Sequence, residues 1–491
     1  HTGRWNIEGK PVAILVDFTP FFSVKDKILT GFWDRFGLDS ISGGWDYVEP
    51  ALFGYAAARV IESYYNFYLS ATDKLVAHFH EWMTGGGVLH LRDRVPQAAT
   101  VFTTHATVLG RTIAGNHLPL YSDLKLLFNP DQIAREFNVT SKFSLERSTA
   151  QQADAFTVVS AITAEECTYL LGKSVDLVTP NGFDDSFVPA PELFNDARIE
   201  ARVSLLKVAE AVLNRKIDSK AILVVNSGRY EFSNKGIDLF IDALSLLDTD
   251  PELNNEVIAF ITVPANHTGP KKEVVQRLLN GISGESIERE YLTHNLYDAA
   301  ADDILKRLIS KDLFNQKGHK VQVIFVPSYL NGADGVINKT YYDLLIGFDL
   351  SAFPSYYEPW GYTPLESIAF HVPTVTTNLA GFGLWMKEYS KSQENGVLVL
   401  ERNETNTLSV TSGIAYFIKN ETDQTQFAVV HRKTGEPLLN VSAEFYQNEY
   451  RDNKSRNIKI GNRASDADGF IIPNIKQNVN FSVIFSKGTD T

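Results

Sequence analysis

Cysteine is almost missing from the 491-residue sequence, since Cys167 is the only one. The chain can therefore form neither an intrachain disulfide nor a cysteine-based zinc site, as is usual for proteins of a reducing cytoplasm. Long apolar runs are missing too, because none approaches the roughly 18 to 20 residues of a membrane span. The first residues do not read as a signal peptide. We therefore expect a cytoplasmic protein without a membrane partner.

Basic residues are outnumbered, with 46 Lys and Arg against 59 Asp and Glu and a net charge of −13. This balance argues against a nucleic-acid-binding protein, so an anionic substrate would need a local group of cations. The length exceeds what one ordinary hydrophobic core supports, and the 44% hydrophobic content fits two or three domains.

Short apolar β-rich runs alternate with helical patterns along most of the chain, which is the rhythm of βαβ units around parallel sheets. A first series extends from Pro11 to about Asp185, and a second begins near Lys220. The first series predicts strands at 12–18, 75–80 and 99–104 and a helix at 55–68. The second predicts strands at 221–226, 257–263, 321–327, 350–354 and 374–377 and helices at 235–247, 341–347 and 364–370. Two doubly wound α/β domains of this kind would enclose a cleft between the carboxyl ends of both sheets.

Beyond about Asn420 the helical periodicity stops, and short alternating runs separated by turn residues take over. Strands are expected at 427–431, 441–446, 470–472 and 481–485, with turns at 433–437 and 466–469. This pattern predicts a small, all-β, sandwich-like module. The predicted domains are 1–195, 196–426 and 427–491.

Two carboxylates, Glu358 and Glu366, bracket a Pro-Trp-Gly-Tyr-Thr-Pro segment between a short strand and a helix. Gly361 would let backbone N–H groups at the helix start face an anion, and the helix dipole would favour a diphosphate there. Glu358 would then point into the cleft beside a sugar, and Glu366, in the first helical turn, could accept hydrogen bonds from ribose hydroxyls. The spacing alone is equally compatible with an ordinary surface loop.

Other candidate residues lie where strands end. Arg229 and Lys235 occupy a strand-to-helix loop, where a planar fork and a point charge could neutralise a diphosphate, although such residues are more often solvated. His105 ends a buried-looking strand, a place where a histidine is more often structural. His78 and His80 lack a specified third ligand, so we predict no metal site.

Four segments resemble, in order and approximate spacing, the UDP-glucose-type glycogen synthases of animals, fungi and bacteria. They are Thr-Thr-His-Ala-Thr at 103–107, Asn-Gly at 181–182, Gly-Arg-Tyr-Glu at 228–231 with Lys-Gly at 235–236, and Ser-Tyr-Tyr-Glu-Pro-Trp-Gly-Tyr-Thr-Pro at 355–364. The resemblance covers about residues 3–420. It implies a GT-B fold, in which two Rossmann-like domains, acceptor-side and nucleotide-sugar-binding, face a cleft that closes on substrate.

The resemblance also implies roles for residues. Glu358 looks like the carboxylate near the anomeric carbon, His105 like the histidine that contacts the glucosyl group, and Arg229 with Lys235 like the pair that stabilises the departing diphosphate. Negative charge on the diphosphate peaks as the glycosidic bond breaks, and because these two side chains and the helix terminus supply the positive charge, no metal or other cofactor is implied. The donor contacts implied are Glu366 for the ribose, the backbone of Gly361, Tyr362 and Thr363 for the phosphates, Tyr341 for the base, and Asn181.

The sequence departs from the family at both ends. The family opens with a Lys-x-Gly-Gly loop that reaches the donor phosphates, and nothing before Pro11 forms one, so we interpret the first domain as truncated at its amino end. The arginine-rich segment that senses glucose 6-phosphate in eukaryotic members is not recognisable after Asn420, so that control is not predicted. Residues 427–491 instead resemble immunoglobulin-like repeats of secreted or periplasmic bacterial proteins.

The function predicted is transfer of glucose from UDP-glucose or ADP-glucose to the non-reducing end of an α-1,4-glucan, with retention of configuration. The partners are accordingly a nucleotide-sugar donor and a glucan acceptor, and a homo-oligomer is left open. One alternative is a catalytically inactive fragment that binds glucan or nucleotide-sugar. Another is a different retaining GT-B transferase.

Overall fold

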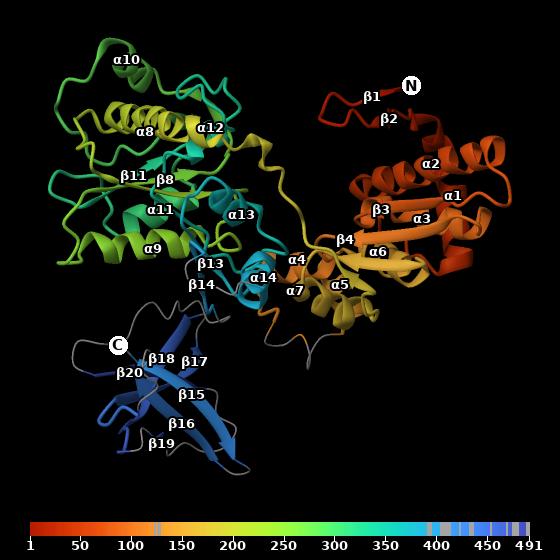
Figure 1. Cartoon of the computed structure of the whole chain (residues 1–491). Coiled ribbons are helices and arrows are strands. Elements are labelled where there is room, and N and C mark those ends of the chain that lie inside the picture. Colours follow the sequence, from red (N-terminus) through yellow and green to blue (C-terminus); the bar gives the residue numbers. More distant parts are fainter. Residues whose placement is uncertain are drawn as a thin grey trace. The chain divides into compact units, whose positions relative to one another are not determined.

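The computed structural model describes residues 1–121, 124, 129–389, 395–402, 414–421, 424–431, 437–451, 454–467, 470–473 and 481–487 (Figure 1). It comprises two compact units, His1–Thr407 and Leu408–Thr491. In the described part of the chain, no helix is both long and apolar enough to cross a membrane. The predicted domain limits at 195 and 426 stay predictions.

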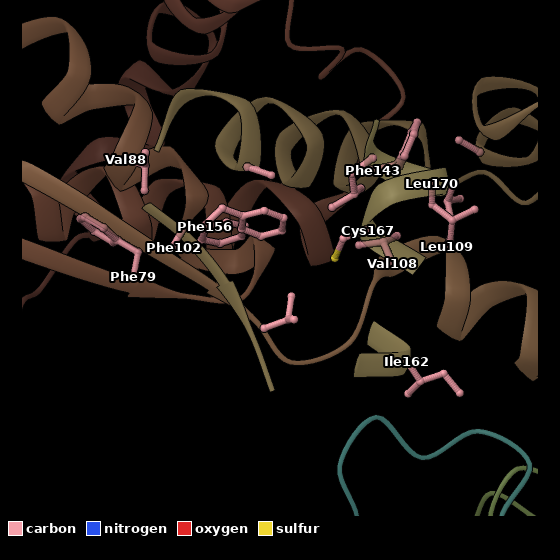
Figure 2. Close-up of a cluster of buried hydrophobic side chains, with 14 of the residues drawn as sticks. Phe79, Val88, Phe102, Val108, Leu109, Phe143, Phe156, Ile162, Cys167 and Leu170 are labelled. Carbon is pink, nitrogen blue, oxygen red and sulfur yellow. The ribbon is translucent and has the colours of Figure 1, made fainter. Parts of the chain in front are cut away.

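The first lobe of the larger unit is built on a four-stranded parallel sheet. Its strands stand in the order β3 (Val76–His80), β4 (Ala99–Thr104), β5 (Ala155–Val158) and β6 (Leu177–Val178). The helices are α1 (Lys25–Phe36), α2 (Trp45–Tyr68), α3 (Gly85–Arg94), α4 (Val108–Gly115), α5 (Pro130–Glu136), α6 (Thr140–Gln152) and α7 (Ala161–Glu166). Apolar side chains from adjacent strands, such as Phe79, Phe102 and Phe156, pack with Cys167 in one buried cluster (Figure 2).

The strand predicted at 12–18 is wrong in both length and place. Only β2 (Val12–Ile14) forms there, and it pairs antiparallel with β1 (Thr2–Arg4) rather than with the parallel sheet. No side chain of this hairpin is fully buried. An apolar run therefore misled the prediction, because apolarity does not say whether a strand has a sheet to enter. The predicted helix at 55–68 is present, but α2 begins ten residues earlier.

The second lobe carries a six-stranded parallel sheet in the order β11-β8-β7-β12-β13-β14. Its strands are β7 (Ile222–Ser227), β8 (Val257–Thr262), β11 (Val321–Phe325), β12 (Leu350–Ala352), β13 (Thr374–Thr377) and β14 (Val397–Leu400). A separate two-stranded antiparallel sheet pairs β9 (His267–Pro270) with β10 (His294–Leu296). Its helices are α8 (Pro191–Leu213), α9 (Ile237–Asp248), α10 (Lys272–Asn280), α11 (Asp303–Ser310), α12 (Tyr341–Leu345), α13 (Tyr362–Ala369) and α14 (Gly381–Tyr389).

Helices cover both faces of this second sheet. Along β8, Ile258 and Phe260 pack in the cluster formed with α8 and α12, whereas Ala259 and Ile261 pack in the cluster formed with α9 and α11 (Figure 1). Side chains alternate across a strand, so a strand apolar at every position is buried on both faces. The chain leaves β7 for β8 on one side and places β12 on the other, so a crevice opens at the carboxyl ends of these strands. The predicted GT-B class of two Rossmann-like lobes is confirmed.

The smaller unit pairs two three-stranded antiparallel sheets. One has the order β15 (Ile414–Glu421), β16 (Gln424–His431) and β19 (Phe470–Ile471), and the other β18 (Lys454–Ala464), β17 (Ser442–Arg451) and β20 (Phe481–Ser486). Phe427 and Ile471 of the first sheet share a core with Phe445 and Phe485 of the second, which confirms the sandwich-like module. The sequence analysis missed β15 and β18. The predicted turns at 433–437 and 466–469 lie mostly outside the described residues, and the immunoglobulin-like relation stays a prediction.

Candidate active site

A pocket of about 330 Å³ lies within the larger unit, where strands of both lobes end. From the first lobe, the residues after β4 and β6 supply His105 and Asn181. From the second, the loops after β7 and β12 supply Arg229, Lys235 and Glu358. The complete lining is His105, Ala106, Arg111, Val159, Asn181, Ser227, Gly228, Arg229, Lys235, Phe353, Ser355, Glu358, Pro359, Trp360, Gly361, Tyr362 and Thr363.

The loops after β7 and β12 are locked together beneath the pocket. The backbone amides of Tyr356 and Tyr357 donate to the carbonyl oxygen of Asn234, at 2.8 and 3.2 Å. Gly236 has φ +69°, and a Cβ atom there would lie 2.0 Å from the carbonyl oxygen of Pro354. Only glycine fits, because the backbone is left-handed and the neighbouring loop fills the space of a side chain.

Lys235 and Glu358 form an ion pair at the base of the pocket. Their side chains are only 11% and 15% exposed, so the pair is largely shielded from solvent. Glu358 is held from both sides, because its carbonyl oxygen also accepts from the Gly381 amide at 3.0 Å. A carboxylate fixed in this way beside a cation can face a substrate without first reorganising.

Two further cations lie at the pocket wall. Arg229 Nη2 is 3.0 Å from Glu231 Oε1, and Arg111 Nη1 of the first lobe is 3.8 Å from the same oxygen. With Lys235, three positive side chains therefore surround a cavity of a chain whose net charge is −13. An anion such as a diphosphate is the ligand that this arrangement favours.

The start of α13 lines the pocket as expected. Gly361, at φ +106°, precedes the helix, and Tyr362 and Thr363 form its first turn at the pocket wall. The helix begins two residues before the predicted 364, so Glu366 lies in its second turn and not in its first. The amino end of α13 adds its partial positive charge to that of the cations.

Two predicted donor contacts are not part of the pocket wall. The hydroxyl of Tyr341 is 2.8 Å from Oγ of Ser227, a lining residue, so Tyr341 lies directly behind the wall. Glu366 accepts a hydrogen bond from the Tyr342 hydroxyl at 2.9 Å, and burial raises the pKa of its carboxyl. The other eight predicted site residues all line the pocket.

His78, His80 and His105 of the first lobe lie close together, with neighbouring rings in contact. Nδ1 of His80 is 3.1 Å from Nε2 of His105, and Nε2 of His78 is 2.7 Å from Oγ1 of Thr103. Burial, helped by the nearby His78, lowers the pKa of both His80 and His105. Because the ordinary histidine pKa is about 6.5, His105 is neutral at pH 7 and can exchange hydrogen bonds with a sugar hydroxyl.

Comparison with known proteins gives the family of this chain. The model of the family described as Glycogen synthase matches residues 1–280 and 270–442. The chain belongs to the glycogen synthase family. It is 30% identical over 457 residues to the liver glycogen [starch] synthase of Rattus norvegicus and 29% identical over 458 residues to the glycogen [starch] synthase of Neurospora crassa. Each alignment covers 82% of this chain and 64% of the relative, less than two thirds of its length.

Two solved structures are similar to this glycogen synthase family member at low sequence identity. One is the catalytic domain of starch synthase IV from Arabidopsis thaliana bound to ADP and acarbose, at TM-score 0.41 and 14% identity, covering 73% of this chain and 68% of that one. The other is sucrose-phosphate synthase from Thermosynechococcus elongatus, at TM-score 0.38 and 15% identity, covering 71% and 65%.

Sequence reasoning missed Arg111, the third cation of the pocket. It lies in α4, the helix that follows His105, just as Lys235 lies in the loop that leads into α9. A basic residue early in a helix after a strand-end histidine was the available signal. The signal was weak because one arginine on a helix is usually solvated, and only the fold brings α4 opposite the second lobe.

Two buried carboxyls, those of Glu146 and Glu166, were also missed. Glu146 makes the stability of the fold depend on pH. Burial, reinforced by the charges of Glu81 and Glu166, raises the pKa of Glu146 from 4.5 to about 8. The folded chain then holds a proton that the unfolded chain releases above its ordinary pKa. We therefore expect the free energy of unfolding to fall as the pH rises from about 5 to about 8.

Glu146→Gln should make that slope shallower. The glutamine oxygen can accept from the Val108 amide, as Glu146 does at 2.9 Å, and its amide nitrogen can donate to the Thr104 hydroxyl. Urea unfolding at intervals of pH measures the effect, and Glu388→Gln, an exposed change in α14, is the control. Equal slopes for Glu146→Gln and the unmodified chain would show that Glu146 does not carry the proton.

Proposed function

We propose that the chain transfers glucose from UDP-glucose or ADP-glucose to the non-reducing end of an α-1,4-glucan with retention of configuration. One observation carries the proposal: Glu358, Arg229 and Lys235 of one lobe line the same pocket as His105 of the other. Membership of the glycogen synthase family supports it. A cytoplasmic location belongs to the same proposal.

Each group would act on a different part of the donor. Negative charge grows on the diphosphate as the bond from the anomeric carbon breaks, and Arg229, Lys235 and Arg111 would stabilise it together with the amino end of α13. Glu358 would lie beside the anomeric carbon, where positive charge develops, and neutral His105 would hold a glucosyl hydroxyl. The glucan hydroxyl would then bond to that carbon on the face that the diphosphate leaves, and its proton would pass to the departing diphosphate.

The ribose and base would extend along α13. Glu366 is one turn from Tyr362 on the same helix. Among the described residues, its carboxyl accepts a hydrogen bond only from the Tyr342 hydroxyl. Tyr341 lies behind Ser227, so stacking on a base would require its ring to reach past that residue. Both stay proposed donor contacts.

The test is transfer of labelled glucose to glycogen, with UDP-glucose and ADP-glucose offered separately. We expect transfer from one of the two, release of the matching diphosphate in equal amount, and unchanged turnover in excess EDTA. Omitting glycogen controls for donor hydrolysis. Binding of UDP or ADP by calorimetry without any transfer would assign the chain to the inactive, ligand-binding alternative. Absence of both binding and transfer would refute the proposal.

A further inference from the structure

The mechanism proposed above leaves Glu166 without a task, although its position is unusual. Glu166 is the last residue of α7, and its side chain is fully buried. Its carboxyl nonetheless meets three hydroxyl groups. Oε2 accepts from Thr107 at 2.6 Å and from Tyr357 at 3.3 Å, and Oε1 accepts from Tyr121 at 3.1 Å. A buried carboxyl is costly unless it is hydrogen-bonded, so this site is built around Glu166.

The three hydroxyls belong to segments that shape the pocket. Thr107 caps α4, because its side chain accepts from the Gly110 amide at 2.9 Å, and α4 carries Arg111. Tyr357 belongs to the second lobe and directly precedes Glu358. Tyr121 packs edge-on against Tyr356 of the same loop, with ring centroids 6.2 Å apart. One carboxyl therefore connects the carriers of two pocket charges.

The fit around this carboxyl is close. A Cβ atom on Gly110 would lie 2.2 Å from Oε2 of Glu166, so the α4 backbone rests directly on it. The Tyr356 hydroxyl adds a parallel contact, since it accepts from the Leu120 amide at 3.0 Å. A carboxylate only accepts hydrogen bonds, which matches three hydroxyl donors. Alanine at position 166 would remove the acceptor that these three hydroxyls share.

We propose that Glu166 is a positioning residue for glucose transfer: by holding the hydroxyls of Thr107 and Tyr357 together, its carboxyl fixes α4 and the Glu358 loop against each other. The role of Glu166 in glucose transfer rests on the function proposed above. Its role in positioning residues 354–361 does not, because it applies whether or not the chain transfers glucose. Glu166 itself does not line the pocket, so it would act through Tyr357 and Thr107.

The environment of Glu166 supports this assignment. Burial raises its pKa to about 7, while the three hydroxyls and the charge of Arg111 hold it down. A group balanced in this way depends on each hydroxyl contact, so loss of one contact should loosen the others.

Hydrogen–deuterium exchange of the peptide spanning 354–361 tests the proposal in the full chain. Its Tyr356 and Tyr357 amides are protected by Asn234, so they report whether the loop stays in place. We expect exchange to rise about tenfold in Tyr357→Phe, as the loss of one buried hydrogen bond predicts. Glu166→Ala should raise it further, and Glu166→Gln, which keeps an acceptor oxygen, should restore most of the protection.

The matched control is Tyr291→Phe. Tyr291 is also buried and donates its hydroxyl at 2.8 Å, to the Leu313 carbonyl, but it packs in the cluster of α9 and α11 and does not line the pocket. Its variant should unfold at a temperature as low as Tyr357→Phe does and leave 354–361 protected. Unchanged exchange in both Tyr357→Phe and Glu166→Ala, or an equal rise in Tyr291→Phe, would overturn the proposal.

Activity adds a second readout. We expect kcat to fall about tenfold in Tyr357→Phe, and we expect Tyr357→Phe combined with Glu166→Ala to be no slower than Glu166→Ala alone, since residues that act through one another are not additive. Additive losses would contradict a shared role. If the unmodified chain transfers no glucose, the proposed function fails, and the exchange result still decides the positional role. Should Glu166→Ala not fold, Tyr357→Phe and its control Tyr291→Phe carry the test.

Discussion

Glu358→Gln should lower the rate of glucose transfer by at least about 10³-fold, the largest loss that we expect from one substitution. Glutamine keeps the shape of the side chain but removes the negative charge that would face the anomeric carbon. Binding of UDP should persist, because the three cations and the start of α13 are unchanged. Initial rates with labelled donor and glycogen, together with calorimetric titration of UDP, measure both quantities.

Stability has to be separated from catalysis in this experiment. Removing one partner of a buried ion pair costs about 3–5 kcal/mol, and Glu358→Gln leaves Lys235 without its counter-charge. Glu290→Gln is the matched control, because Glu290 pairs with Lys271 at 2.7 Å. The side chains of Glu290 and Lys271 are 21% and 18% exposed, so this pair is about as buried as that of Glu358. It should destabilise the fold comparably and transfer glucose normally. Near-normal turnover by Glu358→Gln would overturn the assignment of Glu358.

Arg229→Ala should lower transfer by about 10²- to 10³-fold, the usual cost of removing one group that stabilises transition-state charge. Its side chain is 60% exposed and pairs only with Glu231 among the ion pairs of the described residues, so the fold should be unaffected. The transfer rate of Arg229→Lys should lie between those of Arg229→Ala and the unmodified chain, because lysine restores the positive charge but not the planar guanidinium group. Rates at saturating donor, with thermal unfolding in parallel, measure the effect.

Arg94→Ala controls for the loss of an exposed arginine. Arg94 is 59% exposed, lies at the end of α3 and does not line the pocket. We expect normal transfer from this variant. If Arg229→Ala also transfers normally, the diphosphate is stabilised by Lys235 and Arg111 alone, and the role given to Arg229 is wrong.

The second sheet was the most predictable part of the fold. Strand β13 has the predicted limits, Thr374–Thr377, and β7, β8, β11 and β12 lie within a residue or two of theirs at most ends. These strands are buried on both faces, so nearly every residue in them is apolar or β-branched and the signal is continuous. Strand β2 (Val12–Ile14) is just as apolar but lies in an exposed hairpin, and there the prediction failed.

Eight site residues could be expected to meet because parallel strands end at one edge of a sheet. Arg111 could not, since nothing local distinguishes it from a solvated helix residue. Glu146 and Glu166 were missed for the same reason. Glutamates in helices are normally exposed, and only the packing of α4 and α6 with α7 and the second lobe shows that these two are buried.

The contact between Gly236 and Pro354 has a consequence for motion. The loops after β7 and β12 cannot slide past each other without a clash, and the amides of Tyr356 and Tyr357 tie them further. Lys235 and Glu358 should therefore move together as parts of one rigid unit. The separation of these two charges should stay nearly constant over time.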